Sequence, residues 1–193
     1  MFNLFKKKDN STKVIETQVS DEYVEWRKTF LNFQSTGDLK DIPNLKGIPN
    51  EVYGLLMDVG MGDEHINFFA ISIYAFNTGE SSLKASSGTG IMGIGNVESV
   101  KGVPEKIVEL GQSMLEFANP ETNFNYPEAG RVHFFFLTTS GIKSYKCSLN
   151  ELQNGHPFHE MFDLFTQLKG AADKLSKALP VARTVAKVKK LFK

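Results

Sequence analysis

The sequence has few of the residues that staple a fold covalently. Among 193 residues there is one cysteine, Cys147, and a lone cysteine cannot form an internal disulfide. Because disulfides are typical of oxidising compartments, a chain with a single cysteine is expected in a reducing one. No stretch approaches the roughly 18 consecutive apolar residues of a membrane span. The first charges follow a very short apolar stub, which is not the pattern of a secretory signal peptide. We therefore expect a soluble cytoplasmic protein.

A net charge is also lacking, since 22 basic and 22 acidic residues balance. The balance hides three regions. Residues 1–13 carry four lysines and one aspartate, a net charge of +3, and residues 169–193 carry eight basic residues and one aspartate, a net charge of +7. Residues 14–168 hold the remainder, a net charge of −10. The chain thus has an acidic body between two basic ends.

The hydrophobic pattern predicts helices at the start, middle and end of the body. Ser20 is the expected N-cap of a helix over 21–34, which has acidic residues in its first turn and aromatic residues at helical spacing. A second helix is predicted over about 103–118, because its early proline is tolerated in a first turn. A third is predicted over 158–179, where Pro180 should interrupt it.

Four segments with β-branched and aromatic residues are predicted strands, over 51–59, 66–77, 131–138 and 142–148, and the serine-rich segment over 81–87 is predicted to be a fifth. Short links between them favour antiparallel hairpins. The order α-βββ-α-ββ-α is typical of an α+β two-layer sandwich with a mainly antiparallel five-stranded sheet, in the style of profilin-like, roadblock-like or longin-like modules. The expected divisions are a basic N-terminal segment, a single α+β domain and a basic amphipathic C-terminal helix, over 1–19, 20–178 and 179–193.

Several short motifs lie between about residues 52 and 168. They are Asp58-Val-Gly60-Met-Gly62, Thr78-Gly79-Glu80-Ser-Ser-Leu83, Gly88-Thr-Gly90-Ile-Met-Gly93-Ile-Gly95, Gly130-Arg-Val-His-Phe-Phe-Phe-Leu-Thr138 with Gly141, and Asn154-Gly155-His156-Pro157. In combination they resemble a family of bacterial proteins of unknown function. The resemblance implies a bacterial, cytoplasmic protein, and it implies no catalytic residues.

The most suggestive motif is a glycine-rich loop, whose glycines are Gly88, Gly90, Gly93 and Gly95. The spacing matches the dinucleotide fingerprint, in which backbone N–H groups approach a phosphate at a helix N-terminus. The strand before it is short and serine-rich, and no acidic residue ends a second parallel strand about 20 residues later. We therefore expect the glycines to permit tight turns and close packing. A small ligand or anion at this loop, with Asp58 and His156 nearby, is the alternative.

Asp58 begins an acidic segment that also holds Gly60 and Gly62. A calcium loop needs oxygen ligands at alternate positions over twelve residues and a closing glutamate, and the spacing here fails that requirement. The sequence predicts a hairpin turn with solvated carboxylates at this point.

His156, His159 and Cys147 are the other residues with ligand chemistry. Together they offer three zinc ligands, but no CxxC or HxxxH pair accompanies them. Cys147 as a nucleophile would need a nearby histidine and a lowered pKa. The prediction is one histidine in a turn, one on a helix face, no metal and no cofactor.

The two ends of the chain combine lysines with apolar residues. At the start, Phe and Leu residues precede Lys6, Lys7 and Lys8. Near the end, valines and Phe192 share one stripe of a predicted helix, and beside them lie Arg183, Lys187, Lys189 and Lys190. A basic amphipathic helix can lie on an anionic membrane surface or dock on an acidic protein surface, including the body of this chain. Nucleic acid is disfavoured, because the acidic body would repel phosphates.

These observations predict a non-catalytic bacterial cytoplasmic module for interaction or regulation, with a protein partner and peripheral docking at the inner membrane face through the basic ends. One alternative is a ligand-binding or enzymatic domain that uses the loop over 88–95. Another is an immunity-type inhibitor whose acidic surface blocks a basic toxin. The row of Phe over 131–138 covers either a core or a homodimer surface, and periodicity does not separate the two.

Overall fold

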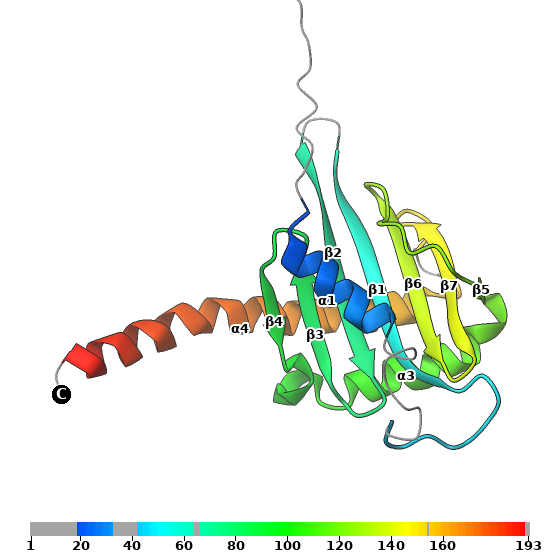
Figure 1. Cartoon of the computed structure of the whole chain (residues 1–193), viewed down its shortest axis with the longest axis horizontal. Helices are drawn as coiled ribbons and strands as arrows, with labels where there is room; N and C mark the ends of the chain where they lie inside the picture. The colour runs from blue at the N-terminus through cyan, green and yellow to red at the C-terminus, as the bar shows by residue number, and fades with distance from the viewer. Residues whose placement is uncertain (1–18, 33–41, 64–65, 154, 192–193) are drawn as a thin grey trace, which may run out of the picture.

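The computed structural model describes residues 19–32, 42–63, 66–153 and 155–191. Within these ranges the fold is α+β, with three helices and a seven-stranded antiparallel open sheet (Figure 1). The helices are α1 (Asp21–Leu31), α3 (Val103–Met114) and α4 (His159–Leu191). The strands are β1 (Val52–Asp63), β2 (Ile66–Phe76), β3 (Ser81–Ala85), β4 (Gly90–Met92), β5 (Asn119–Pro120), β6 (Arg131–Thr138) and β7 (Gly141–Ser148). Short 3₁₀ turns are η2 (Ile94–Asn96), η3 (Glu98–Val100) and η4 (Leu115–Phe117).

The strands lie in the order β4-β3-β2-β1-β6-β7-β5. The five predicted strands are confirmed as β1, β2, β3, β6 and β7, and the predicted antiparallel hairpins β1–β2, β2–β3 and β6–β7 are present. The sequence missed β4 and β5, which add one strand at each edge. They have three and two residues, which is too short for a two-residue periodicity to be visible.

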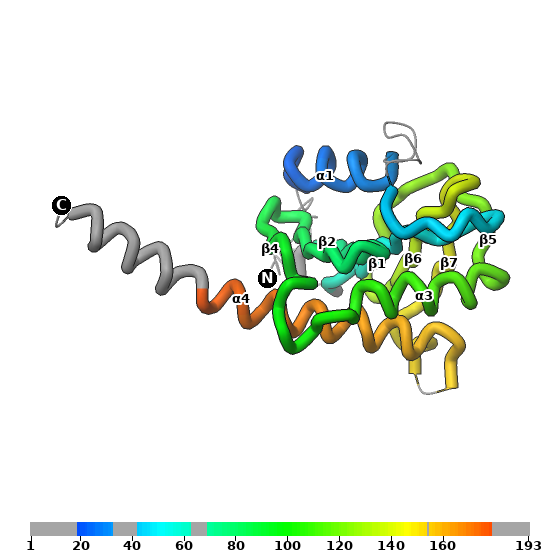
Figure 2. The backbone as a smooth tube through the Cα atoms, turned by 90° about the horizontal axis from the view of Figure 1, so that it is seen from below, coloured from blue at the N-terminus to red at the C-terminus, as the bar shows by residue number. Residues whose placement is uncertain are grey.

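The predicted two layers are wrong, because helices cover both faces of the sheet. Figure 2 shows α1 on one side of the sheet and α3 and α4 on the other. Successive residues of β1 point to opposite faces, so Leu55 and Met57 join the core beneath α3 and α4, and Leu56 joins the core beneath α1. A strand that is apolar on both faces needs a layer on each. Phe134 and Phe136 belong to the first core and Phe135 to the second, so this row is buried and forms no dimer surface.

Helix α1 begins as predicted, since the Ser20 hydroxyl accepts a hydrogen bond from the backbone N–H of Tyr23 at 3.2 Å. The helix ends at Leu31, three residues before the predicted end. Its apolar side packs on aromatic residues of β2, with ring centroids of Phe30 and Tyr74 4.4 Å apart. Aromatic packing of this kind stabilises the contact beyond the area that it buries.

The other two helices also begin where the sequence predicts. Pro104 lies in the first turn of α3, and the regular helix ends at Met114, from where η4 continues to Phe117. Helix α4 runs on to Leu191, so the predicted interruption at Pro180 is wrong. A proline inside a helix removes one backbone hydrogen bond and costs about 3 kcal/mol, so that it kinks or breaks the helix. In α4 the helical backbone continues on both sides of Pro180. None of the described helices combines the length and the apolarity needed to cross a membrane.

Candidate functional site

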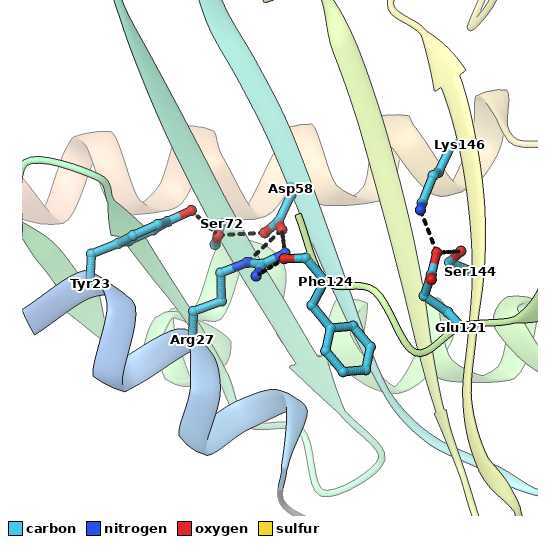
Figure 3. A network of polar contacts seen from close by, with 8 residues as sticks. All are labelled: Tyr23, Arg27, Asp58, Ser72, Glu121, Phe124, Ser144 and Lys146. Carbon is cyan, nitrogen blue, oxygen red and sulfur yellow. Dashed lines mark hydrogen bonds and ion pairs between the residues drawn. The ribbon is translucent and has the colours of Figure 1, made fainter. Parts of the chain in front are cut away.

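Asp58 lies inside β1 and not in the predicted solvated turn. Its side chain is 0% exposed, and it faces α1. Nε and Nη2 of Arg27, on α1, lie 2.8 Å and 2.6 Å from Asp58 Oδ2, and the Ser72 hydroxyl of β2 donates to Oδ1 at 2.5 Å (Figure 3). The segment was misread because Asp and closely spaced Gly are typical of turns. Nothing local shows that a cation lies opposite the carboxylate.

The network continues on both sides of the ion pair. Because Ser72 donates its proton to Asp58, the Tyr23 hydroxyl donates to the Ser72 oxygen, 2.6 Å away. Burial, reinforced by the nearby charge of Asp58, raises the pKa of Tyr23, so this hydroxyl keeps its proton. Nη1 of Arg27 donates to the backbone oxygen of Phe124 at 2.6 Å, and the guanidinium carbon lies 4.9 Å from the ring centroid of Tyr126.

This network joins three parts of the fold: α1, the central strands and the segment over 121–130. The four side chains at its centre are buried, Arg27 being 5% exposed and Tyr23, Asp58 and Ser72 0%. A substrate therefore has no path to the carboxylate while α1 stays in place. The arrangement fixes α1 to the sheet, and it is not an open reactive site.

A second polar contact holds the segment that follows β5. Glu121 accepts from the Ser144 hydroxyl at 2.9 Å and pairs with Lys146 (Figure 3). Burial alone would raise the pKa of Glu121, but hydrogen bonds from Lys146, from the backbone of Asn123 and from Ser144 outweigh it and lower the pKa to about 2. Glu121 therefore stays ionised across the physiological range and anchors the segment to β7.

Gly60 of β1 allows the far end of the same segment to approach. A Cβ at Gly60 would lie 2.0 Å from the backbone oxygen of Glu128, and the N–H of Gly130 donates to the Gly60 oxygen at 2.9 Å. Gly62 has a φ of 120°, a conformation that side-chain-bearing residues rarely adopt. Both glycines of this motif thus have a structural role at the end of β1.

The glycine-rich loop packs against the body, as the structural interpretation predicts. Gly88 and Gly93 have φ values of 89° and 71°, and Ile94 is fully buried. A Cβ at Gly95 would lie 1.9 Å from the backbone oxygen of Gly79. Gly90 belongs to the edge strand β4, beside a small hollow of about 210 Å³ that β3, β4 and α4 line.

The structure does not bring the predicted ligand-binding residues together. The glycine loop lies at the β4 edge of the sheet, Asp58 is enclosed in the central strand β1, and His156 contacts Tyr145 of β7, near the other edge. Strands β3, β2, β1 and β6 lie between β4 of the loop and β7, which His156 contacts. The predicted residues therefore do not form one pocket.

His156 and His159 both form hydrogen bonds close to the start of α4. His156 Nδ1 accepts from the backbone N–H of Phe158 at 3.1 Å, and its Nε2 lies 3.2 Å from the Tyr145 hydroxyl. His159 Nδ1 lies 3.0 Å from the backbone oxygen of Leu152. Among the described side chains, no group of three or more His, Cys, Asp or Glu is placed to hold a metal ion.

Cys147 is 3% exposed, and burial raises the pKa of its thiol to about 11. The thiolate is the reactive form, so a buried thiol with a raised pKa is inert. We expect iodoacetamide at pH 8 to leave the folded protein unmodified and to alkylate Cys147 fully in 6 M guanidinium, as measured by intact mass. Equal alkylation rates with and without denaturant would contradict this placement.

The sequence missed an open depression of about 450 Å³ between the segment over 42–51, the end of β2 and α3. Three glutamates line it. The Glu51 carboxylate accepts backbone hydrogen bonds from Lys46 and Gly47 at 2.6 Å and 2.8 Å, and Glu105 and Glu109 lie one turn apart on α3. The spacing of the two helical glutamates was a usable signal, whereas the approach of Glu51 to them is set by the tertiary fold.

The predicted docking residues Lys6, Lys7, Lys8 and Phe192 lie outside the described residues. Arg183, Lys187, Lys189 and Lys190 belong to α4, of which the structure describes only the backbone at these positions.

No protein-family model, curated protein or solved structure matched the chain. The charges and contacts described above therefore carry the functional argument.

Proposed function

We propose that the protein is a non-catalytic bacterial interaction module of the cytoplasm, which docks through its charged surfaces. The observation that carries the proposal is the division of charge: a net charge of −10 over residues 14–168, against +3 and +7 at the two ends. Charge of one sign gathered in one region speeds encounter with a partner of opposite sign and selects it. The buried ion pair of Arg27 and Asp58 supports a non-catalytic role, because its side chains hold α1 to the sheet and a substrate cannot reach them.

In the version that we favour, the basic ends dock at the anionic inner face of the membrane. Each lysine near such a surface contributes about 1 kcal/mol. Replacing Lys187, Lys189 and Lys190 with glutamine should therefore weaken binding to anionic vesicles roughly 100-fold. The measurement is flotation of the full chain with phosphatidylserine vesicles, beside a truncation to residues 14–178.

A matched control replaces Lys28, Lys101 and Lys106 with glutamine, which makes the same change of charge at exposed positions of the acidic body. This control should float like the unaltered chain, and binding should weaken as salt is raised. If the full chain and the truncation float equally, or neither floats, membrane docking is wrong.

A second candidate is an immunity-type inhibitor, whose acidic surface would block a basic toxin. Glu105 and Glu109 at the depression favour it, because both are exposed and neither forms an ion pair within the described part of the chain. Purification of the protein together with the product of a neighbouring gene would support this function, and the absence of any specific partner would count against it.

We also propose that the domain is a variant of the profilin-like, roadblock-like or longin-like plan. Without the two short edge strands, five central strands remain in the order β3-β2-β1-β6-β7, with helices at the start, middle and end. The structure of a variant that lacks β5 would test this proposal. The five central strands should keep their order if β5 is an addition at the edge.

A further inference from the structure

A row of polar side chains crosses the face of the sheet that α1 covers. Ser72 of β2 lies opposite Asp58 of β1, which lies opposite His133 of β6. His133 in turn lies opposite Lys146 of β7. Side chains that lie opposite each other in an antiparallel sheet are neighbours on the same face. In Figure 3 strand β6 runs between Asp58 and Lys146, so His133 lies between an anionic and a cationic side chain.

The imidazole of His133 is half-buried beneath the segment over 121–130. The ring hydrogen-bonds the backbone of Asn125, and its centroid lies 6.0 Å from that of Phe135 in an edge-to-face contact. Its Nδ1 atom is buried and has no hydrogen-bond partner among the described residues. A proton on Nδ1 would therefore find no acceptor while the segment is in place, and an unsatisfied buried donor is costly.

The charges on the neighbouring elements also disfavour a protonated ring. Lys146 of β7 and Arg27 of α1 oppose a positive charge on His133, and Asp58 of β1 favours one. The charge of Asp58 is already balanced, because Nε and Nη2 of Arg27 lie 2.8 Å and 2.6 Å from its Oδ2 atom. Burial, reinforced by Lys146 and Arg27, lowers the pKa of His133 below the ordinary value of 6.5.

The covering segment and β6 itself supply no free carboxylate. Glu121 of the segment pairs with Lys146, and the ring of Tyr126 lies 4.9 Å from the guanidinium carbon of α1. Arg131 precedes His133 by two residues and lies on the same face of β6. Within the described residues, the carboxylates near the imidazole are thus already paired, and none is left to balance an imidazolium.

We propose that His133 is a pH-sensitive latch, under which the segment over 121–130 is closed while the imidazole is neutral and opens when it binds a proton. In the closed state the proton meets two cations and a ring nitrogen without an acceptor, whereas in the open state water solvates it. Because the open state binds the proton more tightly, the closed state is fully stable above about pH 6.5 and loses stability as the pH falls below that value.

Opening of the latch would change the surface that the domain presents. The rings of Phe124, on the segment, and Phe135, on β6, lie 5.9 Å apart in the closed state, and Phe135 is 0% exposed. Withdrawal of the segment uncovers one side of this aromatic cluster. An apolar surface that appears only in acid can bind a partner in acid and not at neutral pH. The latch goes beyond the proposed function and does not depend on it.

The first test is an NMR titration of the histidine C2–H resonances of the full chain between pH 8 and 4.5. The resonance of His133 should titrate with a midpoint well below 6.5, because the closed state resists the proton. A midpoint at the ordinary value would overturn the proposal, since the imidazolium would then be as well accommodated beneath the segment as in water.

The second test is hydrogen exchange of the Gly130 amide, which donates to the Gly60 oxygen at 2.9 Å when the segment is closed. An open state with an ordinary imidazole gains at most about 30-fold in population between pH 7.5 and 5.0. The protection factor, corrected for the intrinsic rate at each pH, should therefore fall about 5- to 30-fold in the unaltered chain. In His133→Gln it should fall less than about twofold. Glu121, with a pKa of about 2, stays ionised over this range and does not contribute.

The matched control is His159→Gln, the same substitution at a half-buried histidine of α4, on the other side of the sheet. It should keep the full loss of Gly130 protection in acid. Where His133→Gln does not fold, Lys146→Gln takes its place, and removal of that cation should raise the titration midpoint of His133 and reduce the loss of protection. The proposal is overturned if protection does not fall in the unaltered chain, or if it falls equally in the variant.

Discussion

Replacing Asp58 with asparagine should lower the free energy of unfolding by about 3–5 kcal/mol. The substitution keeps the size of the side chain and removes its charge, which leaves the Arg27 guanidinium 5% exposed and without its counter-charge. Desolvation of an unpaired ion is the source of the large effect. The measurement is urea unfolding followed by circular dichroism and Trp fluorescence, with Trp26 on α1 as the probe of that helix.

A matched control breaks the exposed ion pair of Lys28 with Glu25, which lies on the same helix with side chains 62% and 72% exposed. Lys28→Gln should cost less than about 1 kcal/mol. Combining Asp58→Asn with Arg27→Met should cost less than the sum of the two single changes, because the second substitution removes the uncompensated charge. A cost below 1 kcal/mol for Asp58→Asn would show that the ion pair does not hold α1 to the sheet.

Gly95→Ala should destabilise the protein by about 3 kcal/mol or more, at the upper end of what overpacking costs. The added methyl group would lie 1.9 Å from the backbone oxygen of Gly79 and 3.1 Å from Pro104 Cγ. Both neighbours are backbone or ring atoms, so the clash cannot be relieved by turning a flexible side chain. Thermal unfolding monitored by circular dichroism measures the effect.

The control for this substitution is Gly170→Ala in α4, where a Cβ meets no atom within 4 Å. Alanine in a helix interior is favoured over glycine by about 0.5–1 kcal/mol, so this variant should be slightly more stable than the original. If Gly95→Ala were as stable as the original chain, the close packing of the glycine loop on the turn at Gly79 would be wrong.

The parts of the fold that the sequence predicts well are those with local signals. The Ser20 cap, the proline in the first turn of α3 and the run of aromatic residues in β6 are all signals within a few neighbouring residues. The site residues depend on distant ones. Asp58 resembles a turn residue until Arg27, 31 positions earlier, is placed opposite it. The third layer follows from the packing of α1 on strands that begin only at Val52.

The depression also combines a local signal in the sequence with a contact between distant residues. Glu105 and Glu109 are visible in the sequence as a helical pair, but Glu51 reaches them only because β1 starts beside α3. The glycine-rich loop was interpreted correctly: its spacing resembles a phosphate loop, but the serine-rich strand before it favoured packing, and its backbone packs against the turn at Gly79. A motif is informative about chemistry only when the elements on both sides match it as well.

The position of β1 in the centre of the sheet has a consequence for synthesis of the chain. One edge of β1 pairs with β2 within a hairpin, but the other edge pairs with β6, where Leu56 lies opposite Phe135. At about 5–20 residues per second, that second partner is made roughly 4–16 s after β1. During this interval a long apolar strand has an open edge, which is the kind of surface that chaperones cover. We therefore expect folding to be completed late, when the β6–β7 hairpin closes the sheet.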